Sequence, residues 1–376
     1  MTDLRNVVSA VDEGLVEALA PSPSQYELQQ ALTDFPKVDL HRHLEGSLRL
    51  RTLMEIARQE GLDLPQEESQ LREQVQIGST EPKTLPNFLS KFRVLRTVYR
   101  SPEIIRRVTH EAIEDAAIDN VVYLELRFTP AALSQAKDFP IPEVIEWVIE
   151  FAGEAAHKFE IRVGLIASVN RHEPVELAEA VAQIAADHAG EGIFGLDLAG
   201  NELDYPADSF TSIFKSAEQA GLNTTVHAGE WTGAESVNQA LSTMGATRIG
   251  HGVRVLEDME VVAMARDRRV AFEVCLTSNL HSGVVGGMAE HPLMEMINAG
   301  LVVTLNTDDP GISNIRLSDE YFTAVSELGL SEGTLKGLIL SGAQYSFLPE
   351  PEKKELERRL QQSLGLGMNS GKDMSR

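Results

Sequence analysis

Eight short apolar runs, rich in β-branched residues, alternate along the chain with longer stretches whose apolar residues recur every three or four positions. The short runs span residues 37–41, 120–128, 161–169, 193–199, 223–228, 247–251, 270–276 and 301–306. The three- and four-residue spacing is typical of amphipathic helices, and almost wholly apolar runs are typical of strands covered on both faces. The pattern predicts an α/β fold with a parallel sheet, either a (β/α)8 barrel or an open doubly wound sheet.

Polar and ionisable side chains stand at or just beyond the carboxyl ends of the predicted strands. They are His41, His43, Arg127, Asp197, His227, His251 and Asp308. In a (β/α)8 barrel the carboxyl ends of all strands share one face, so these residues would converge on one pocket. An open sheet would spread them along a crevice, and the placement therefore favours a TIM-type barrel.

The barrel is expected to occupy residues 34–365, after an N-terminal arm of two short helices at residues 1–33 and before a disordered tail at residues 366–376. The link between the first two strands, residues 42–119, is longer than the others. Its helical stretches either form a lid over the carboxyl-end face or pack as a helical pair on the side of the barrel.

Composition narrows the classes of partner. The formal net charge of -24, from 57 acidic and 33 basic residues, argues against a nucleic-acid backbone and favours a small neutral or cationic molecule or a metal ion. An acidic surface that serves only solubility is the alternative.

The single cysteine, Cys275, excludes an internal disulfide and a CxxC metal site. With no secretory signal and no apolar stretch long enough for a membrane span, we expect a cytoplasmic protein with no membrane partner.

The segment HRHLEG places His41 and His43 two residues apart at a strand end, where both side chains point to one side. His227 in HAGE ends another strand, and the aspartates of TDDP follow a third. Three imidazoles and a carboxylate suit a divalent ion such as Zn²⁺ that keeps one position open for water, and Asp308 is the better placed aspartate. Such an ion makes its bound water nucleophilic near neutral pH. The alternative for Asp-Asp-Pro-Gly is a turn.

Four further residues are candidates for substrate chemistry. Asp309 is placed to accept a proton or a hydrogen bond from the attacking water, and His251, flanked by glycines, could orient that water or be a core histidine. Glu230 could donate a proton to a substrate nitrogen, or stabilise a helix N-terminus. Gly200 could let a substrate approach the main chain, or form a turn.

The ordered motifs HRHLEGSLR, DLAGNE, HAGE, RIGHG, VCLTSN and TDDP resemble those of the adenosine deaminase family, from about residue 36 to the last helices. The resemblance implies a zinc-dependent (β/α)8 barrel, a hydrolase of the C–N bond of cyclic amidines that removes the 6-amino group of a purine. It implies zinc ligation by His41, His43, His227 and Asp308. It further implies that Glu230 protonates purine N1, that His251 and Asp309 orient the hydroxide, that the Gly200 N–H meets purine N3, and that an apolar lid is formed by Leu85, Phe88 and Phe92.

Glu45 departs from the pattern that the resemblance implies. Adenosine-specific members commonly have Asp there, in contact with a ribose hydroxyl, whereas Glu occurs in relatives that act on free adenine. DLAGNE resembles the nucleoside enzymes, and the longer carboxylate of Glu45 can still reach a hydroxyl. We therefore expect adenosine and deoxyadenosine as substrates. The alternatives are another 6-aminopurine (adenine, aminodeoxyfutalosine or a modified adenine nucleoside) or a metal-bound nucleoside-binding protein without catalysis.

Overall fold

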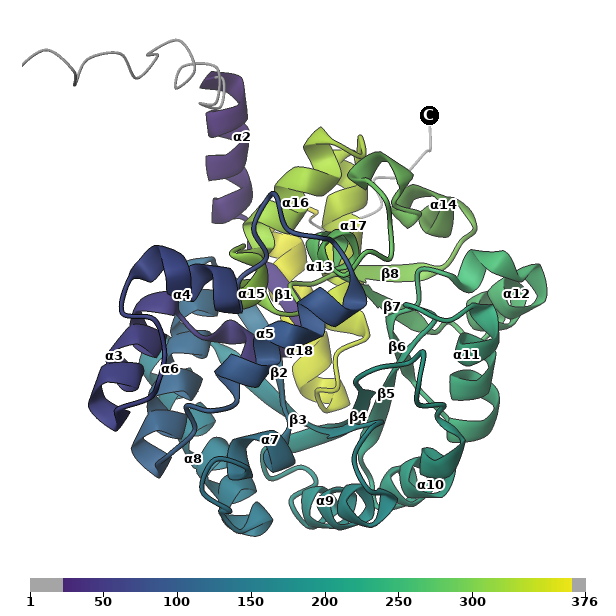
Figure 1. Cartoon of the computed structure of the whole chain (residues 1–376). Coiled ribbons are helices and arrows are strands. Elements are labelled where there is room, and N and C mark those ends of the chain that lie inside the picture. Colours follow the sequence, from purple (N-terminus) through teal and green to yellow (C-terminus); the bar gives the residue numbers. More distant parts are fainter. Residues whose placement is uncertain (1–22, 367–376) are drawn as a thin grey trace, which may run out of the picture.

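The computed structural model describes residues 23–366, and its centre is a barrel of eight parallel strands in chain order (Figure 1). The strands are β1 (Lys37–His43), β2 (Val121–Phe128), β3 (Arg162–Asn170), β4 (Ile193–Ala199), β5 (Asn223–Ala228), β6 (Arg248–His251), β7 (Ala271–Val274) and β8 (Val302–Leu305). Almost every strand residue is buried, as expected for a sheet covered on both faces. The predicted (β/α)8 barrel and all eight predicted strands are confirmed.

The main chain just beyond β8 closes the barrel. The Asp308 N–H donates to the His41 carbonyl at 2.7 Å, and the His43 N–H donates to the Asp308 carbonyl at 2.8 Å. These two bonds form a parallel bridge between Arg42 and Asp308. The TDDP segment therefore lies beside the H-x-H segment, although more than half of the chain separates them.

Helices surround the strands. They are α2 (Pro23–Asp34), α3 (Leu50–Glu60), α4 (Glu68–Val75), α5 (Leu85–Leu95), α6 (Pro102–Ile118), α7 (Pro130–Ser134), α8 (Ile141–Phe159), α9 (Val175–Asp187), α10 (Thr211–Gln219), α11 (Ala234–Gln239), α12 (Met259–Asp267), α13 (Leu276–His281), α14 (Leu293–Asn298), α15 (Pro310–Ser313), α16 (Leu317–Ser326), α17 (Glu332–Gln344) and α18 (Glu350–Ser363). Four short 3₁₀ helices among the described residues are η1 (Glu45–Ser47), η2 (Asp208–Phe210), η4 (Val255–Glu257) and η5 (Met288–Glu290). The segment η3 (Ala240–Met244) is a π-helix. Among the described residues, no helix is long and apolar enough to cross a membrane.

Several helices begin at residues whose side chains cap them. Thr84, Ser101, Asp258 and Ser331 each accept a hydrogen bond from a backbone N–H in the first turn that follows. Such caps satisfy donors that the helix itself cannot pair. Pro102 at the first position of α6 has no N–H to satisfy, which makes Ser-Pro an efficient helix start.

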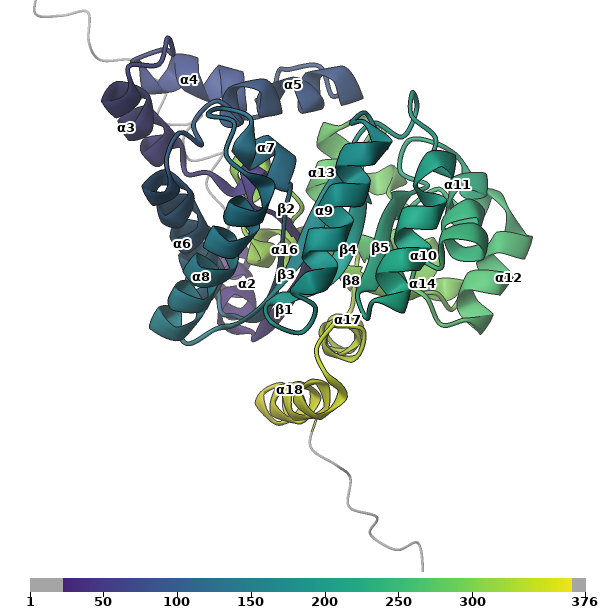
Figure 2. The same ribbon diagram turned by 90° about the horizontal axis from the view of Figure 1, so that it is seen from below.

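The long link between β1 and β2 forms α3, α4, α5 and α6. Figure 2 shows α4 and α5 at one end of the barrel and α17 and α18 at the other. Because Phe88 and Phe92 of α5 line the cavity at the carboxyl ends of the strands, α5 lies at that face rather than wholly on the side of the barrel. Whether α5 moves as a lid stays a prediction.

The predicted boundaries are only partly covered by the described residues. The second helix of the predicted arm is present as α2, while its first helix and nearly all of the predicted tail lie outside the described residues. The last described helix, α18, buries Leu356 and Leu360. The assignment of residues 34–365 to one domain stays a prediction.

A buried ionic network fills the barrel interior below the carboxyl-end face. Glu273 accepts from Arg248 Nε at 2.6 Å and from Arg127 Nη2 at 2.8 Å, and Arg248 also donates to Glu125. The side chains of all four residues are 0–1% exposed. Buried charges are tolerated only when they are paired, so each member depends on the others.

We expect Arg248→Met to lower the free energy of unfolding by about 3–5 kcal/mol, because it leaves Glu125 and Glu273 buried with too little compensating charge. Urea denaturation followed by circular dichroism measures the change. The control is Arg51→Met, which removes an exposed ion pair with Glu55 on α3 and should cost less than about 1 kcal/mol. Equal effects of the two substitutions would contradict the prediction.

Candidate metal centre and active site

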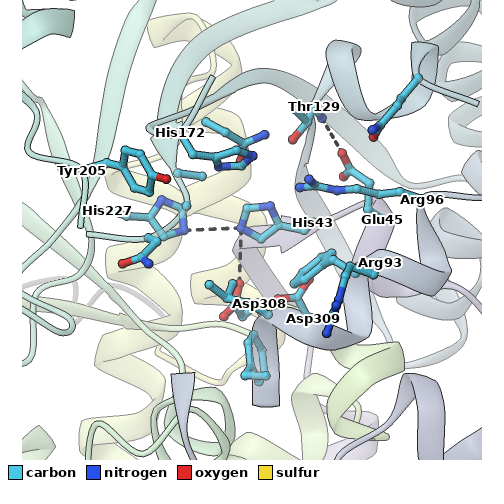
Figure 3. A pocket seen from close by; sticks show the side chains of 18 of the residues that line it. His43, Glu45, Arg93, Arg96, Thr129, His172, Tyr205, His227, Asp308 and Asp309 are labelled. Atoms are coloured by element: carbon cyan, nitrogen blue, oxygen red, sulfur yellow. Dashed lines mark hydrogen bonds and ion pairs between the residues drawn. The ribbon is translucent and has the colours of Figure 1, made fainter. Parts of the chain in front are cut away.

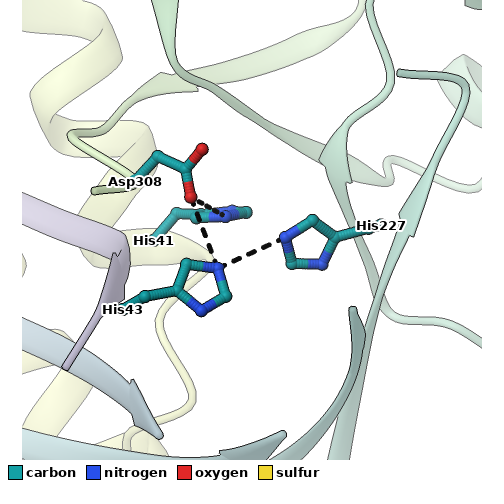
Figure 4. Close-up of side chains that lie close together, drawn as sticks. All are labelled: His41, His43, His227 and Asp308. Carbon is teal, nitrogen blue, oxygen red and sulfur yellow. Dashed lines mark hydrogen bonds and ion pairs between the residues drawn. The ribbon is translucent and has the colours of Figure 1, made fainter. Parts of the chain in front are cut away.

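His41 and His43 of β1, His227 of β5 and Asp308 just after β8 form one cluster (Figure 4). Their ligand atoms all lie within 4.8 Å of one another. Each strand contributes its carboxyl end, so the barrel brings together residues that the sequence separates by up to 267 positions, from 41 to 308. The four predicted metal ligands are therefore neighbours.

The arrangement of donor atoms fits a cation. The Nε2 atoms of His41 and His43 each lie 3.3 Å from Asp308 Oδ1, and the Nε2 atoms of His43 and His227 are 3.4 Å apart. His41 Nε2 is buried and makes no hydrogen bond. Buried polar atoms nearly always have a hydrogen-bond partner. A buried nitrogen without one, which faces other atoms that can donate an electron pair to a metal, therefore indicates a site for a positive ion.

Carboxylates on the far side hold the imidazoles in place. His41 Nδ1 contacts Glu273 Oε2 at 2.8 Å, and His227 Nδ1 contacts Asp197 Oδ1 at 3.0 Å. A carboxylate at Nδ1 keeps the proton there, so the Nε2 lone pair is directed into the cluster. The Ser278 hydroxyl donates to Asp308 Oδ2 at 2.6 Å and orients the fourth member in the same way.

The adjacent aspartates Asp308 and Asp309 occupy opposite electrostatic environments. Burial raises the pKa of Asp308, but contact with His41 and the charges of the surrounding imidazoles outweigh it and hold that pKa well below its usual range. Burial and the charge of Asp308 raise the pKa of Asp309 well above its usual range. Asp309 packs against Gly46, where an added Cβ would lie 1.7 Å from Asp309 Oδ1. The two environments therefore favour the anionic form of Asp308 and the protonated form of Asp309, which reduces the repulsion between the two charges.

Glu230 and His251 adjoin the cluster. His251 Nε2 lies 3.7 Å from both Glu230 Oε1 and Asp308 Oδ2, and its Nδ1 accepts from the Asn279 amide at 3.1 Å. That bond leaves the ring proton on Nε2, facing the site. Burial lowers the pKa of His251 well below its usual range. Burial and the charges of Asp308 and Glu202 raise the pKa of Glu230 well above its usual range, which favours the protonated carboxyl.

Glu202 supports the candidate site and was missed by sequence reasoning. Its carboxylate accepts from the backbone N–H groups of Gly229, Glu230, Trp231 and Thr232 at 2.7–3.2 Å, and from the Ser236 hydroxyl. The turn after β5 is thereby wrapped around one buried carboxylate. The motif DLAGNE contains Glu202, but nothing in the sequence indicates that its partners lie in the HAGE turn.

A cavity of about 650 Å³ opens beside the cluster (Figure 3). The predicted residues Glu45, Phe88, Phe92 and Gly200 line it, while Leu85 is buried in α5 and is not among the lining residues. Glu45 Oε1 accepts from the Thr129 N–H at 2.8 Å, and its Oε2 is buried without a hydrogen-bond partner. Glu230 Oε2 is also buried and unpartnered. Both free oxygens indicate a ligand with complementary polar groups.

We expect Glu202→Gln to loosen the turn at residues 229–232, because an amide has one acceptor oxygen and its NH₂ group faces backbone donors. Losing one charge-assisted hydrogen bond typically costs about 1.5–3 kcal/mol. Hydrogen exchange should therefore show faster exchange at these amides, while β1 amides stay protected. The control Glu235→Gln, an exposed residue of α11, should leave the turn unchanged. Unaltered exchange in Glu202→Gln would remove this role from Glu202.

Comparison with known proteins agrees with this geometry. The family model described as adenosine deaminase matches residues 36–363. An adenosine deaminase of Salmonella typhimurium is 38% identical over 328 residues, which cover 86% of this chain and 97% of that protein.

Two solved structures share the fold at lower identity. The adenine deaminase of Arthrobacter aurescens superposes with a TM-score of 0.81 at 28% identity and covers 88% of this chain and 99% of its own. The Arabidopsis protein ADAL in complex with IMP has a TM-score of 0.80 at 27% identity and covers 90% of this chain and 99% of its own.

Proposed function

The chain belongs to the adenosine deaminase family, and from this premise we propose that it hydrolyses adenosine and deoxyadenosine to the inosine nucleosides and ammonia, with zinc as its metal. One observation carries the proposal. A set of cation ligands and a neutral Glu230 face the same purine-sized cavity, where one can supply a nucleophile and the other a proton.

His41, His43, His227 and Asp308 would hold the metal. Three imidazoles and one carboxylate without sulfur are a ligand set that zinc accepts, and carbon–nitrogen hydrolysis needs no redox-active ion. A divalent cation in such a site supplies a water molecule acidified enough to attack near neutral pH. Side chains of the protein itself supply the proton and the hydrogen bonds that the substrate needs.

Hydrolytic deamination adds a water oxygen to purine C6 and breaks the bond from C6 to the amino nitrogen. Protonation of N1 makes C6 more electrophilic, and Glu230 holds the required proton because its pKa is raised. His251 is neutral and presents its Nε2–H to the same space, where it donates to the oxygen as negative charge develops. Asp309 accepts a hydrogen bond from the attacking water when a bound cation offsets the repulsion from Asp308.

The choice of adenosine rests on Glu45 and on the relatives. Glu45 Oε2 is buried without a partner, and a ribose hydroxyl supplies the missing donor, whereas free adenine would leave it unpaired. The Salmonella relative is named an adenosine deaminase at 38% identity, compared with 28% for the adenine deaminase of Arthrobacter. Gly200, with a φ of +94°, lines the cavity, and in the proposed binding mode its N–H donates to a ring nitrogen of the purine. Turnover of nucleosides fits the cytoplasm, which we propose as the location.

We expect ammonia release from adenosine and deoxyadenosine by the zinc-loaded protein, much less from adenine, and none after the metal is removed. Ammonia measured across a panel of 6-aminopurines tests the substrate, and elemental analysis tests the metal. Activity that survives complete chelation would refute the metal centre, and preference for adenine would move the substrate to the free base. Binding of adenosine without any ammonia release would support a nucleoside-binding protein instead.

We expect Glu230→Gln to keep the fold and the metal but to lower kcat by about 10²–10⁴-fold, because an amide cannot deliver the proton to N1. The wild-type kcat/KM should fall as pH rises through the raised pKa of Glu230, since the proton donor is then lost. Glu235→Gln on α11 is the matched control and should retain full turnover. A near-normal kcat in Glu230→Gln would reassign this carboxyl to a structural role.

A further inference from the structure

His251 needs its ring proton on Nε2 to donate to the reacting oxygen, as required by the proposed function, on which this inference rests. The groups that face the site do not fix the proton there. Nε2 lies 3.7 Å from Glu230 Oε1, which can donate when it is protonated, and 3.7 Å from Asp308 Oδ2, which accepts. The position of the proton is therefore set at Nδ1, on the other side of the ring.

A chain of three hydrogen bonds behind His251 runs from Nδ1 to a main-chain donor. The amide nitrogen of Asn279 contacts His251 Nδ1 at 3.1 Å, and the amide oxygen of Asn279 contacts His291 Nε2 at 3.1 Å. His291 Nδ1 accepts from the Leu293 N–H at 3.2 Å. The three side chains are only 0–3% exposed, so bulk water does not compete for these contacts.

The direction of this chain is fixed at its far end. Leu293 is the first residue of α14, so its N–H has no partner inside the helix and can only donate. His291 Nδ1 accepts that bond, and burial lowers the pKa of His291 to about 4, which keeps the ring neutral with its single proton on Nε2. That proton needs an acceptor, so the Asn279 oxygen faces His291. The Asn279 NH₂ group then faces His251, whose Nδ1 carries a lone pair.

The main chain of Asn279 is held on both sides. Its N–H donates to the Cys275 carbonyl at 3.0 Å, and its carbonyl accepts from the N–H groups of Val284 and Val285 at 2.9 and 3.2 Å. The freedom that remains to Asn279 is rotation of its amide group, which exchanges the positions of the oxygen and the nitrogen. Such a rotation would place the oxygen against His251 Nδ1 and draw the ring proton to that nitrogen.

We propose that His291, acting through Asn279, is a positioning residue that holds the proton of His251 on Nε2. His291 is not among the residues that line the cavity. Its Nε2–H is the donor that keeps the Asn279 oxygen turned away from His251. Without this donor the two orientations of the Asn279 amide become similar in energy, and His251 divides between the tautomer that can donate to the reacting oxygen and the one that cannot.

Two substitutions of His291 separate its donor from its acceptor. His291→Gln places an NH₂ group near the position of Nε2 and keeps a donor for Asn279. His291→Asn places its polar atoms near the position of Nδ1, so it keeps an acceptor for the Leu293 N–H but loses the donor. We expect His291→Asn to lower kcat for adenosine about 5- to 100-fold with KM little changed, the usual effect of leaving a buried polar group without its partner. His291→Gln should restore most of that turnover.

The control is His157→Asn, at an exposed position of α8, which should change neither kcat nor KM. A loss in His291→Gln as large as that in His291→Asn would contradict a role for the donor.

The tautomer of His251 is the measurement that a merely structural role of His291 would not change. Nitrogen-15 NMR of the zinc-loaded full chain, labelled on histidine, distinguishes a ring nitrogen that carries a proton from one that carries a lone pair. Comparison with His251→Gln assigns the signals. We expect the proton on Nε2 in the wild type and in His291→Gln, and a mixture of tautomers in His291→Asn. A proton on Nδ1 in the wild-type protein would overturn the proposal whatever the variants do.

Asn279→Asp tests the same chain at its middle residue, should His291→Asn fail to fold. A carboxylate in place of the amide can only accept, so it should move the His251 proton to Nδ1. The expected loss in kcat is about 10²–10³-fold, as for removal of one donor to a developing oxyanion. A proton that stays on Nε2 in Asn279→Asp would show that the chain does not set the tautomer.

The outcomes separate this role of His291 from the proposed function. Turnover of adenosine with the same His251 tautomer in the wild type and in both chain variants overturns the role and leaves the proposed function intact. A fall in kcat without a change of tautomer also overturns it. If the wild-type protein releases no ammonia from adenosine, the proposed function fails, and the tautomers measured by NMR still decide whether His291 sets the proton of His251.

Discussion

Two backbone hydrogen bonds between β1 and the segment after β8 hold the first and last parts of the barrel together. They join Asp308 to the carbonyl of His41 and the N–H of His43. Without these bonds, nothing in the main chain would hold the Asp308 carboxylate beside β1, the strand that carries His41 and His43. Because Asp308 has a φ of +61°, in the left-handed region that costs a non-glycine residue energy, its position is determined by this closure rather than by local preference. The candidate metal centre is thus a product of barrel closure.

Burial then assigns protonation states to the groups around that centre. Removal from water favours the neutral form of every acid, and only a nearby positive group reverses the effect. Asp308 has such groups in the imidazoles, whereas Asp309 and Glu230 face other carboxylates. Different neighbours consequently favour the anionic form of Asp308 and the protonated forms of Asp309 and Glu230. In the proposed hydrolysis Asp308 has to be anionic to hold a cation while Glu230 keeps a proton for the substrate, and such different environments let both states exist at one pH.

The site is also supported from beneath and from the side by carboxylates that do not face the substrate. Glu273 links His41 to Arg127 and Arg248 deep in the barrel, and Glu202 gathers the backbone donors of the turn that carries Glu230. Such partners fix the orientation of the reactive groups. Arg93, Arg96 and Arg100 add positive charge to another wall of the cavity, and the charge of Arg96 acts on Glu45 and Asp309.

The sequence alone determined the strands and most of the candidate site. Apolar runs with polar residues at their carboxyl ends are local patterns, and a parallel barrel places all such ends on one face, so the sequence is enough to group His41, His43, His227 and Asp308. Only the tertiary structure decided which groups are buried without a partner, which carboxylate holds which turn, and that Leu85 lies behind the cavity while Arg96 reaches into it. Those facts depend on side-chain packing between segments that are distant in sequence. Local spacing carries no information about the direction or the desolvation of a side chain across such a contact.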